Sequence, residues 1–309
     1  MTSQPFPASS PYQRDVTLWE PEGKPHGFVV IAHGMAEHIA RYDNLGQSLS
    51  RAGFLVAGYN HLGHGGEAPL LGWFSDADGW GKLVGDLHAV LQSLAARWPG
   101  VPRVLLGHSM GSFLAREYVL RYPGELDALV LSGTGWQSRM LCHAGLLMAR
   151  LACSLGLEKK ASAFLDKMAF SANNKPFEVP GGTAFDWLSR DKAEVEKYTK
   201  DPLCGFLFTA GGFRDMFSGL LALTDIERLK ALPSGLPVYL LSGGDDPVGG
   251  KGAGVRQIAS QYQAAGLLSV DVMLYEGARH ELFNELNRDE AISGLISWLS
   301  GALRVYKEE

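Results

Sequence analysis

Residues 103–116 constrain the fold of this chain more than any other segment. A short apolar run at 104–106 leads into the pattern Gly-His-Ser-Met-Gly at 107–111, and a helix-compatible stretch follows at once. This order is typical of a sharp strand-to-helix turn that lifts a serine hydroxyl above the end of a strand. The flanking glycines have a steric reason, because a side chain there would collide with the neighbouring strand or helix. Ser109 is therefore the predicted nucleophile.

Two later segments supply the partners that a serine nucleophile needs. Residues 236–242 are strand-like and break into a glycine-rich turn that carries Asp245 and Asp246. Residues 270–275 alternate like a strand, and the loop after them contains His280. An acid after one strand and a histidine after the last strand follow the chain order that accompanies such a turn. We predict Ser109, Asp246 and His280 as a catalytic triad, with Asp245 as the alternative acid.

An earlier apolar run predicts the remaining part of such a site. Residues 28–32 form a strand-like stretch that ends in His33-Gly34-Met35. The oxyanion of a tetrahedral intermediate is held by the amide that follows the nucleophile and by one from an earlier loop. We therefore predict that the backbone N–H groups of Met35 and Met110 form the oxyanion hole.

Four motifs together resemble one branch of the α/β-hydrolases, the monoacylglycerol lipase and lysophospholipase branch of serine aminopeptidase S33 type. They lie at 33–42, 61–65, 107–111 and 275–280, and the resemblance runs from about residue 12 to the C-terminus. It implies an esterase whose lid covers an apolar acyl channel, with the second of the two adjacent aspartates as the triad acid. One position departs from the family, which usually has Asp where this chain has Asn60.

The order of elements predicts an α/β fold with an insertion. Strand and helix patterns alternate through 1–133 and 223–309, which favours a mostly parallel central sheet with helices on both faces. Residues 134–222 lack this alternation, and we expect them to form an inserted lid, or cap, above the site. Their aromatic residues either contact substrate or pack the lid onto the body; the candidates are Trp136, Trp187, Phe206, Phe208, Phe213 and Phe217.

Composition excludes several classes of function. The 309 residues carry a net charge of −5, which argues against a nucleic-acid partner. Three widely spaced cysteines and an N-terminus unlike a signal peptide predict a cytoplasmic protein with reduced thiols. No uninterrupted apolar run of about 18 residues is present, so we expect no membrane span, although transient contact of the lid with a membrane surface remains open.

The triad and the resemblance together predict a serine esterase that works through an acyl-enzyme. Expected substrates are monoacylglycerols, lysophospholipids or similar short-to-medium acyl esters, with no metal and no organic cofactor. His61 and His64 are interpreted as residues that order a loop rather than as zinc ligands. Two alternatives stay open: an amide or peptide hydrolase similar to prolyl aminopeptidases, and a non-catalytic binding protein on the same scaffold. Acyl length, alcohol and oligomeric state are not determined by the sequence.

Overall fold

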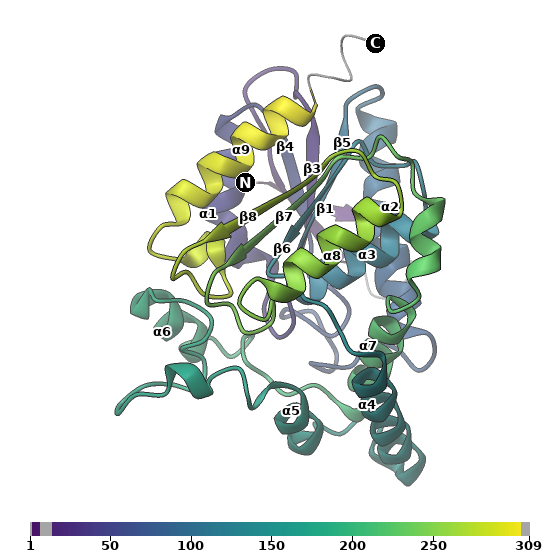
Figure 1. Cartoon of the computed structure of the whole chain (residues 1–309), viewed down its shortest axis with the longest axis vertical. Coiled ribbons are helices and arrows are strands. Elements are labelled where there is room, and N and C mark those ends of the chain that lie inside the picture. The colour runs from purple at the N-terminus through teal and green to yellow at the C-terminus, as the bar shows by residue number, and fades with distance from the viewer. Residues whose placement is uncertain (1, 7–13, 304–309) are drawn as a thin grey trace.

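The computed structural model describes residues 2–6 and 14–303, built around one eight-stranded sheet (Figure 1). Its strand order is β1-β2-β4-β3-β5-β6-β7-β8. The first two strands, β1 (Thr2–Phe6) and β2 (Arg14–Trp19), are antiparallel to their neighbours. The other six run parallel: β3 (Phe28–Ala32), β4 (Leu55–Gly58), β5 (Arg103–His108), β6 (Ala128–Ser132), β7 (Val238–Gly243) and β8 (Val270–Tyr275). The prediction of a mostly parallel central sheet is confirmed.

Helices cover both faces of this sheet, which explains why β3, β4, β6 and β7 are buried at every position. In β3, Val30 packs into one core and Val29 and Ile31 into the other, because successive side chains point to opposite faces. The first core includes side chains of α2 (Gly79–Arg97), α3 (Met110–Arg121) and α8 (Ala253–Ala264). The second includes those of α1 (Asp43–Arg51) and α9 (Arg288–Ala302).

The chain between β6 and β7 forms a helical layer beside the sheet (Figure 1). Within 134–222, all of which the structure describes, no strand forms beyond one isolated bridge between Ala161 and Thr209. Its helices are α4 (Arg139–Ala152), α5 (Ala163–Phe170), α6 (Lys192–Lys200) and α7 (Ala210–Ala222), with short turns at Cys153–Leu157 and Lys175–Phe177. Other short helices lie at Ile39–Tyr42, Ile226–Ala231 and Leu282–Asn284.

One stretch of the insertion bears on the expectation that the chain has no membrane span. The helical segment Arg139–Leu157 has 19 residues and a mean hydropathy of 1.5, and 22% of its window is buried. By length and composition alone it could cross a membrane, although a kink at Gly156, whose φ is 78°, interrupts it. The apolar character of this segment is not evident as an uninterrupted run in the sequence, because His143 and Arg150 interrupt it. In the folded chain α4 packs along α7, whose side chains Phe213, Met216 and Leu220 belong to the first core. The stretch is thus an exposed apolar helix anchored on a buried one.

Candidate active site

Ser109 occupies the sharp turn between β5 and α3. Its backbone has φ 51° and ψ −118°, a conformation that L side chains rarely adopt. The flanking glycines permit this turn: a Cβ on Gly107 would lie 2.3 Å from the carbonyl oxygen of Gly111, and one on Gly111 would lie 2.0 Å from that of Ala32. The turn is also held by the Ser109 amide, which donates to the Ser132 carbonyl at 2.9 Å. The sequence pattern therefore forms the predicted strand-to-helix turn.

Asp246 and His280 form a buried pair beside this turn. Both side chains are at most 2% exposed, and Oδ1 of Asp246 lies 3.0 Å from Nδ1 of His280. The carboxylate also accepts from the Val248 amide at 2.9 Å and from the Ser242 hydroxyl at 3.1 Å. Burial alone would raise the pKa of Asp246, but the imidazole and these hydrogen bonds outweigh it and hold that pKa below its usual value. Burial likewise disfavours protonated His280, yet Asp246 outweighs it, so the pKa of His280 is raised.

Asp245 occupies a different environment from its neighbour. Its side chain is only partly buried, and its backbone amide donates to the carbonyl of Ala278 at 2.9 Å. Of the two aspartates, only Asp246 is hydrogen-bonded to the His280 ring. The structure therefore brings His280 together with the second aspartate of the pair.

The loop after β3 lies against the nucleophile. A Cβ on Gly34 would lie 3.3 Å from the Cβ of Ser109, so the next amide, that of Met35, is close to the turn. Met110 is the first residue of α3, where helix geometry leaves the amide without an intrahelical partner. Within 2–6 and 14–303, neither the Met35 nor the Met110 amide donates a hydrogen bond to another group. Both amides therefore have the capacity to bind an oxyanion.

Buried histidines shape this loop. The Ala36 amide donates to Nε2 of His64 at 3.2 Å, and the His61 amide donates to Nε2 of His33 at 3.1 Å. Burial lowers the pKa of His33 to about 3, so its ring is neutral and able to accept that bond. At the position that departs from the family pattern, Oδ1 of Asn60 accepts from the Ile39 amide at 3.0 Å. These contacts agree with a loop-ordering interpretation of His61 and His64.

A buried charge network lies beneath the same loop, and the sequence analysis did not predict its ion pair between Arg41 and Glu281. Glu37 is 3% exposed and accepts from the Gly34 amide at 2.5 Å and from the Tyr42 hydroxyl at 2.7 Å. Arg41 binds Glu37 at 2.7 Å and both carboxylate oxygens of Glu281 at 2.6 Å. Each carboxylate contributes to the raised pKa of His280. The spacing of Glu37 and Arg41, four apart, was the available signal, whereas nothing local pointed to Glu281.

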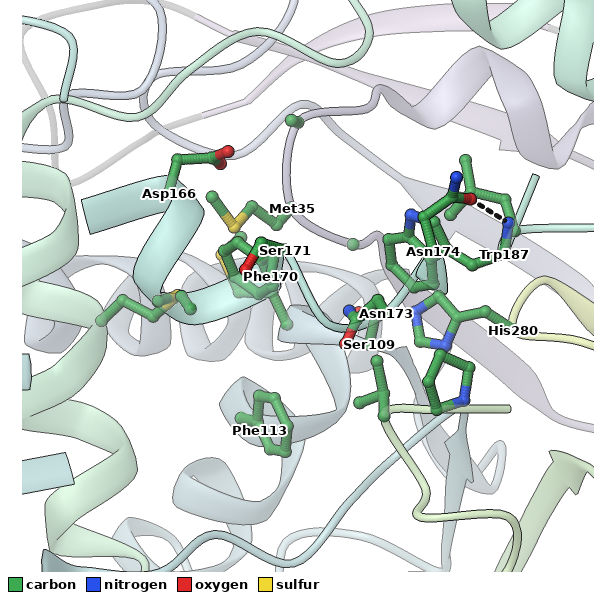
Figure 2. Close-up of a pocket in the computed structure, with 18 of the residues that line it drawn as sticks. Met35, Ser109, Phe113, Asp166, Phe170, Ser171, Asn173, Asn174, Trp187 and His280 are labelled. Carbon is green, nitrogen blue, oxygen red and sulfur yellow. Dashed lines mark hydrogen bonds between the residues drawn. The ribbon is translucent and has the colours of Figure 1, made fainter. Parts of the chain in front are cut away.

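A cavity of about 930 Å³ opens above Ser109 and His280, which both border it (Figure 2). Of the aromatic residues predicted to contact substrate, four line this cavity: Trp136, Trp187, Phe206 and Phe217. The prediction is corrected for Phe208 and Phe213, which are 0% exposed and lie outside the lining. Both pack in the first core, Phe213 from α7 and Phe208 from the segment just before this helix. Lining residues missed from the sequence include Phe113, Leu141, Met168, Phe170, Phe185 and Leu220.

One group of three potential metal ligands occurs in the described part of the chain. Ligand atoms of His38, Asp201 and Cys204 all lie within 4.8 Å of one another. Nε2 of His38 already lies 2.8 Å from a carboxylate oxygen of Asp201, so hydrogen bonding accounts for that contact. The group lies apart from the Asp246–His280 pair in sequence and elements, and the prediction that no metal or cofactor is needed stays a prediction.

Comparison with known proteins places the chain in a family. The model of the family described as serine aminopeptidase, S33, matches residues 23–287. A monoacylglycerol lipase of Mycolicibacterium smegmatis is 31% identical over 285 residues, which cover 91% of each chain. The human monoglyceride lipase is 30% identical over 278 residues, covering 87% of this chain and 80% of the relative.

Solved structures agree with this placement. A carboxyl esterase from Bacillus coagulans, solved in complex with glycerol, superimposes with a TM-score of 0.90 at 26% identity over 98% of each chain. A structure titled as the open form of a lipase gives a TM-score of 0.87, also at 26% identity, over 98% of this chain. The chain belongs to the serine aminopeptidase S33 family, in the monoacylglycerol lipase-like branch of the α/β-hydrolases, and it is a carboxylic ester hydrolase.

Proposed function

We propose that this protein hydrolyses monoacylglycerols through an acyl-enzyme on Ser109. The observation that carries the proposal is the buried Asp246–His280 pair, which borders the same largely apolar cavity as the Ser109 turn. The names of relatives from bacteria and mammals, monoacylglycerol or monoglyceride lipase, support this substrate class.

The proposed reaction follows from the geometry of these groups. A serine hydroxyl is too weak an acid to attack an ester unaided, so His280 takes its proton through Nε2 while Nδ1 stays bonded to Asp246. The oxygen that becomes negative is stabilised by the amides of Met35 and Met110. His280 then returns the proton to the departing alcohol. Water repeats the sequence on the acyl-enzyme and releases the fatty acid.

The charges around the cavity favour a neutral alcohol over a phosphate-bearing one. Lys167 is the only lysine or arginine that lines it in the described chain, whereas Asp166 and Glu178 contribute carboxylates. Burial raises the pKa of the Asp166 carboxyl, and no hydrogen bond or ion pair of the described residues involves its side chain. A phosphate bound here would face these acids with one cation to balance it. The glyceryl group of a monoacylglycerol carries no charge and avoids that repulsion.

We further propose that the insertion contacts a lipid surface. Large apolar side chains on α4, on the turn after it and on α5 are more than half exposed: Met140, Leu141, Leu147, Leu151, Leu155 and Phe164. Figure 1 shows these helices at the end of the molecule farthest from α9. An apolar patch of this extent on a water-exposed helix marks an interaction surface, and a lipid substrate is supplied from an assembled phase.

We also propose a cytoplasmic location. All three cysteines, Cys142, Cys153 and Cys204, are free thiols in the structure. Burial raises the pKa of Cys142 to about 11 and that of Cys204 to about 12, which keeps both thiols protonated and unreactive. Thiols of this kind need no oxidising compartment.

The choice of acid is testable by a matched pair of substitutions. Asp246→Asn is expected to lower kcat/KM for p-nitrophenyl butyrate by about ten-thousand-fold, because the amide no longer holds the required tautomer of His280. Asp245→Asn removes a charge one residue away and is expected to change kcat/KM by less than about threefold. Ser109→Ala sets the baseline, and circular dichroism checks that all three variants fold. Equal losses in the two aspartate variants would show that the acid is misassigned.

The fall of kcat/KM at low pH is expected to follow the protonation of His280. Neutral His280 is the base, and its pKa is raised, so kcat/KM is expected to fall as the pH drops through a midpoint above the usual histidine value of about 6.5. Glu281→Gln removes a carboxylate that raises this pKa, so the midpoint should move to lower pH. Glu276→Gln, an exposed residue of the same loop, should leave it in place. A midpoint that stays fixed or rises in Glu281→Gln would contradict the assignment.

The cavity is expected to set acyl-chain preference. Each buried methylene contributes about 0.8 kcal/mol, so kcat/KM should rise by roughly fourfold per methylene until the cavity is full. Phe217→Ala enlarges the cavity and should move the optimum to longer p-nitrophenyl esters without changing acetate hydrolysis. Phe213→Leu, in the core and outside the lining, should lower the melting temperature and leave the optimum unchanged. The same optimum in all three proteins would mean that Phe217 does not meet the acyl chain.

Contact with lipid is testable by flotation with phosphatidylcholine vesicles. The double variant Leu147→Ser, Leu155→Ser replaces two exposed apolar side chains and should reduce the vesicle-bound fraction by about tenfold. Hydrolysis of water-soluble p-nitrophenyl butyrate should be unchanged. Leu268→Ser, at an 84% exposed leucine outside the insertion, serves as the control. Equal flotation of the wild type and the double variant would exclude this surface.

A further inference from the structure

The second half of the insertion has its own small core. Leu188, Tyr198 and Cys204 form a buried cluster, with Phe185 and Trp187 packed against it, separate from the two cores of the sheet. We call residues 185–205, which carry this cluster, the brace. Its rings and backbone groups contact the loop with Met35 and the loop with His280. It differs in this from the exposed helices α4 and α5 that precede it.

The brace holds the loop that carries the Met35 amide. The carbonyl of the next residue, Ala36, accepts from the Tyr198 hydroxyl at 2.9 Å and from the Gly205 amide at 2.9 Å. On its other side, the Ala36 amide donates to His64. Ala36 has φ 52°, in the left-handed region that a residue with a side chain adopts only when its surroundings impose it. Two of the three hydrogen bonds that impose it come from the brace.

The same segment holds the loop that carries His280. The His280 amide donates to the Trp187 carbonyl at 3.4 Å, and the Glu281 amide donates to the Leu188 carbonyl at 2.8 Å. The Trp187 ring lies 4.8 Å from the imidazole, measured between ring centroids. Two successive backbone hydrogen bonds therefore hold the histidine loop against the brace.

Arg41 connects the two loops that the brace holds, the loop with Met35 and the loop with His280. It binds Glu37 of the first loop and Glu281 of the second, and its guanidinium carbon lies 4.8 Å from the centroid of the Tyr198 ring. The arginine is buried with its two carboxylates, so it fixes both loops at the face of the brace. Tyr198 thus contacts the first loop through its hydroxyl and the arginine of both loops through its ring.

We propose that the brace is part of the catalytic framework rather than of a lid, and that Tyr198 is a positioning residue for the oxyanion hole. The proposal rests on the ester hydrolysis proposed above. An oxyanion donor is effective only when it is held in place before charge develops, and the bonds at Ala36 hold the adjacent Met35 amide. Because every ester forms the same oxyanion, loss of this support should affect all acyl chains equally.

The variant Tyr198→Phe removes the hydroxyl and retains the ring over Arg41. We expect kcat to fall by about tenfold, less than for complete loss of a donor, while KM stays within about twofold. The factor should be the same for p-nitrophenyl acetate and p-nitrophenyl decanoate. Affinity for butylboronic acid, which forms a tetrahedral adduct at the serine, should fall by a similar factor. Tyr122→Phe, at the end of α3 and outside the cavity lining, is the matched control.

Three results would overturn the proposal. They are an unchanged kcat in Tyr198→Phe, a loss confined to decanoate, and a rise in KM alone; the last two would assign Tyr198 to acyl binding. Thermal unfolding checks that Tyr198→Phe is folded. Asp201 of the brace contacts His38 of the loop that follows β3, so Asp201→Asn weakens a second attachment of this loop and should lower kcat equally for both esters. Nitrophenyl esters make the test independent of the natural substrate: wild-type protein that cleaves them but not monoacylglycerol would reject the substrate proposal and leave this one standing.

Discussion

The close approach of α3 to the end of β3 is the constraint on which the site depends. A Cβ on Gly111 would lie 2.0 Å from the carbonyl oxygen of Ala32, so only glycine permits this close approach. The contact places the first turn of α3 directly beside the loop that follows β3. The amides of Met110 and Met35, which come from segments 75 residues apart, thereby flank Ser109. A helix set back by the width of a methyl group would separate them.

Burial acts on His33, His108 and His280 alike, yet their pKa values shift in different directions. Burial lowers the pKa of His33 to about 3 and that of His108 to about 4, so both rings are neutral at physiological pH. His280 is equally buried, but Asp246 raises its pKa instead. Neutral rings can accept backbone hydrogen bonds, as His33 does from the His61 amide, whereas a general base must gain a proton. One carboxylate therefore separates His280, the proposed general base, from histidines that only accept hydrogen bonds.

Patterns within single segments were sufficient to predict the sheet, its parallel order and the turn at Ser109. The position of Asp246 beside His280 also follows from strand ends that share one edge of a sheet. Contacts between distant segments were not predictable in this way. Phe213 and Phe217, four apart on one helix, both belong to the first core, but only Phe217 also lines the cavity. Glu281 binds Arg41, which lies 240 residues away in the sequence, so no local pattern connects the two.

Ser109 and Ala36 share an uncommon property, a left-handed φ in a residue that has a side chain. Each such residue costs about 1–2 kcal/mol relative to an ordinary conformation, and that cost is met when the chain folds. Folding happens once in the lifetime of a molecule, whereas turnover happens many times. Because the distortion is stored in the native state, no cycle of the proposed reaction has to arrange Ser109 or the loop at Ala36 anew. At these two backbone positions the folded protein is less stable, and the geometry that the proposed reaction needs is already present before substrate binds.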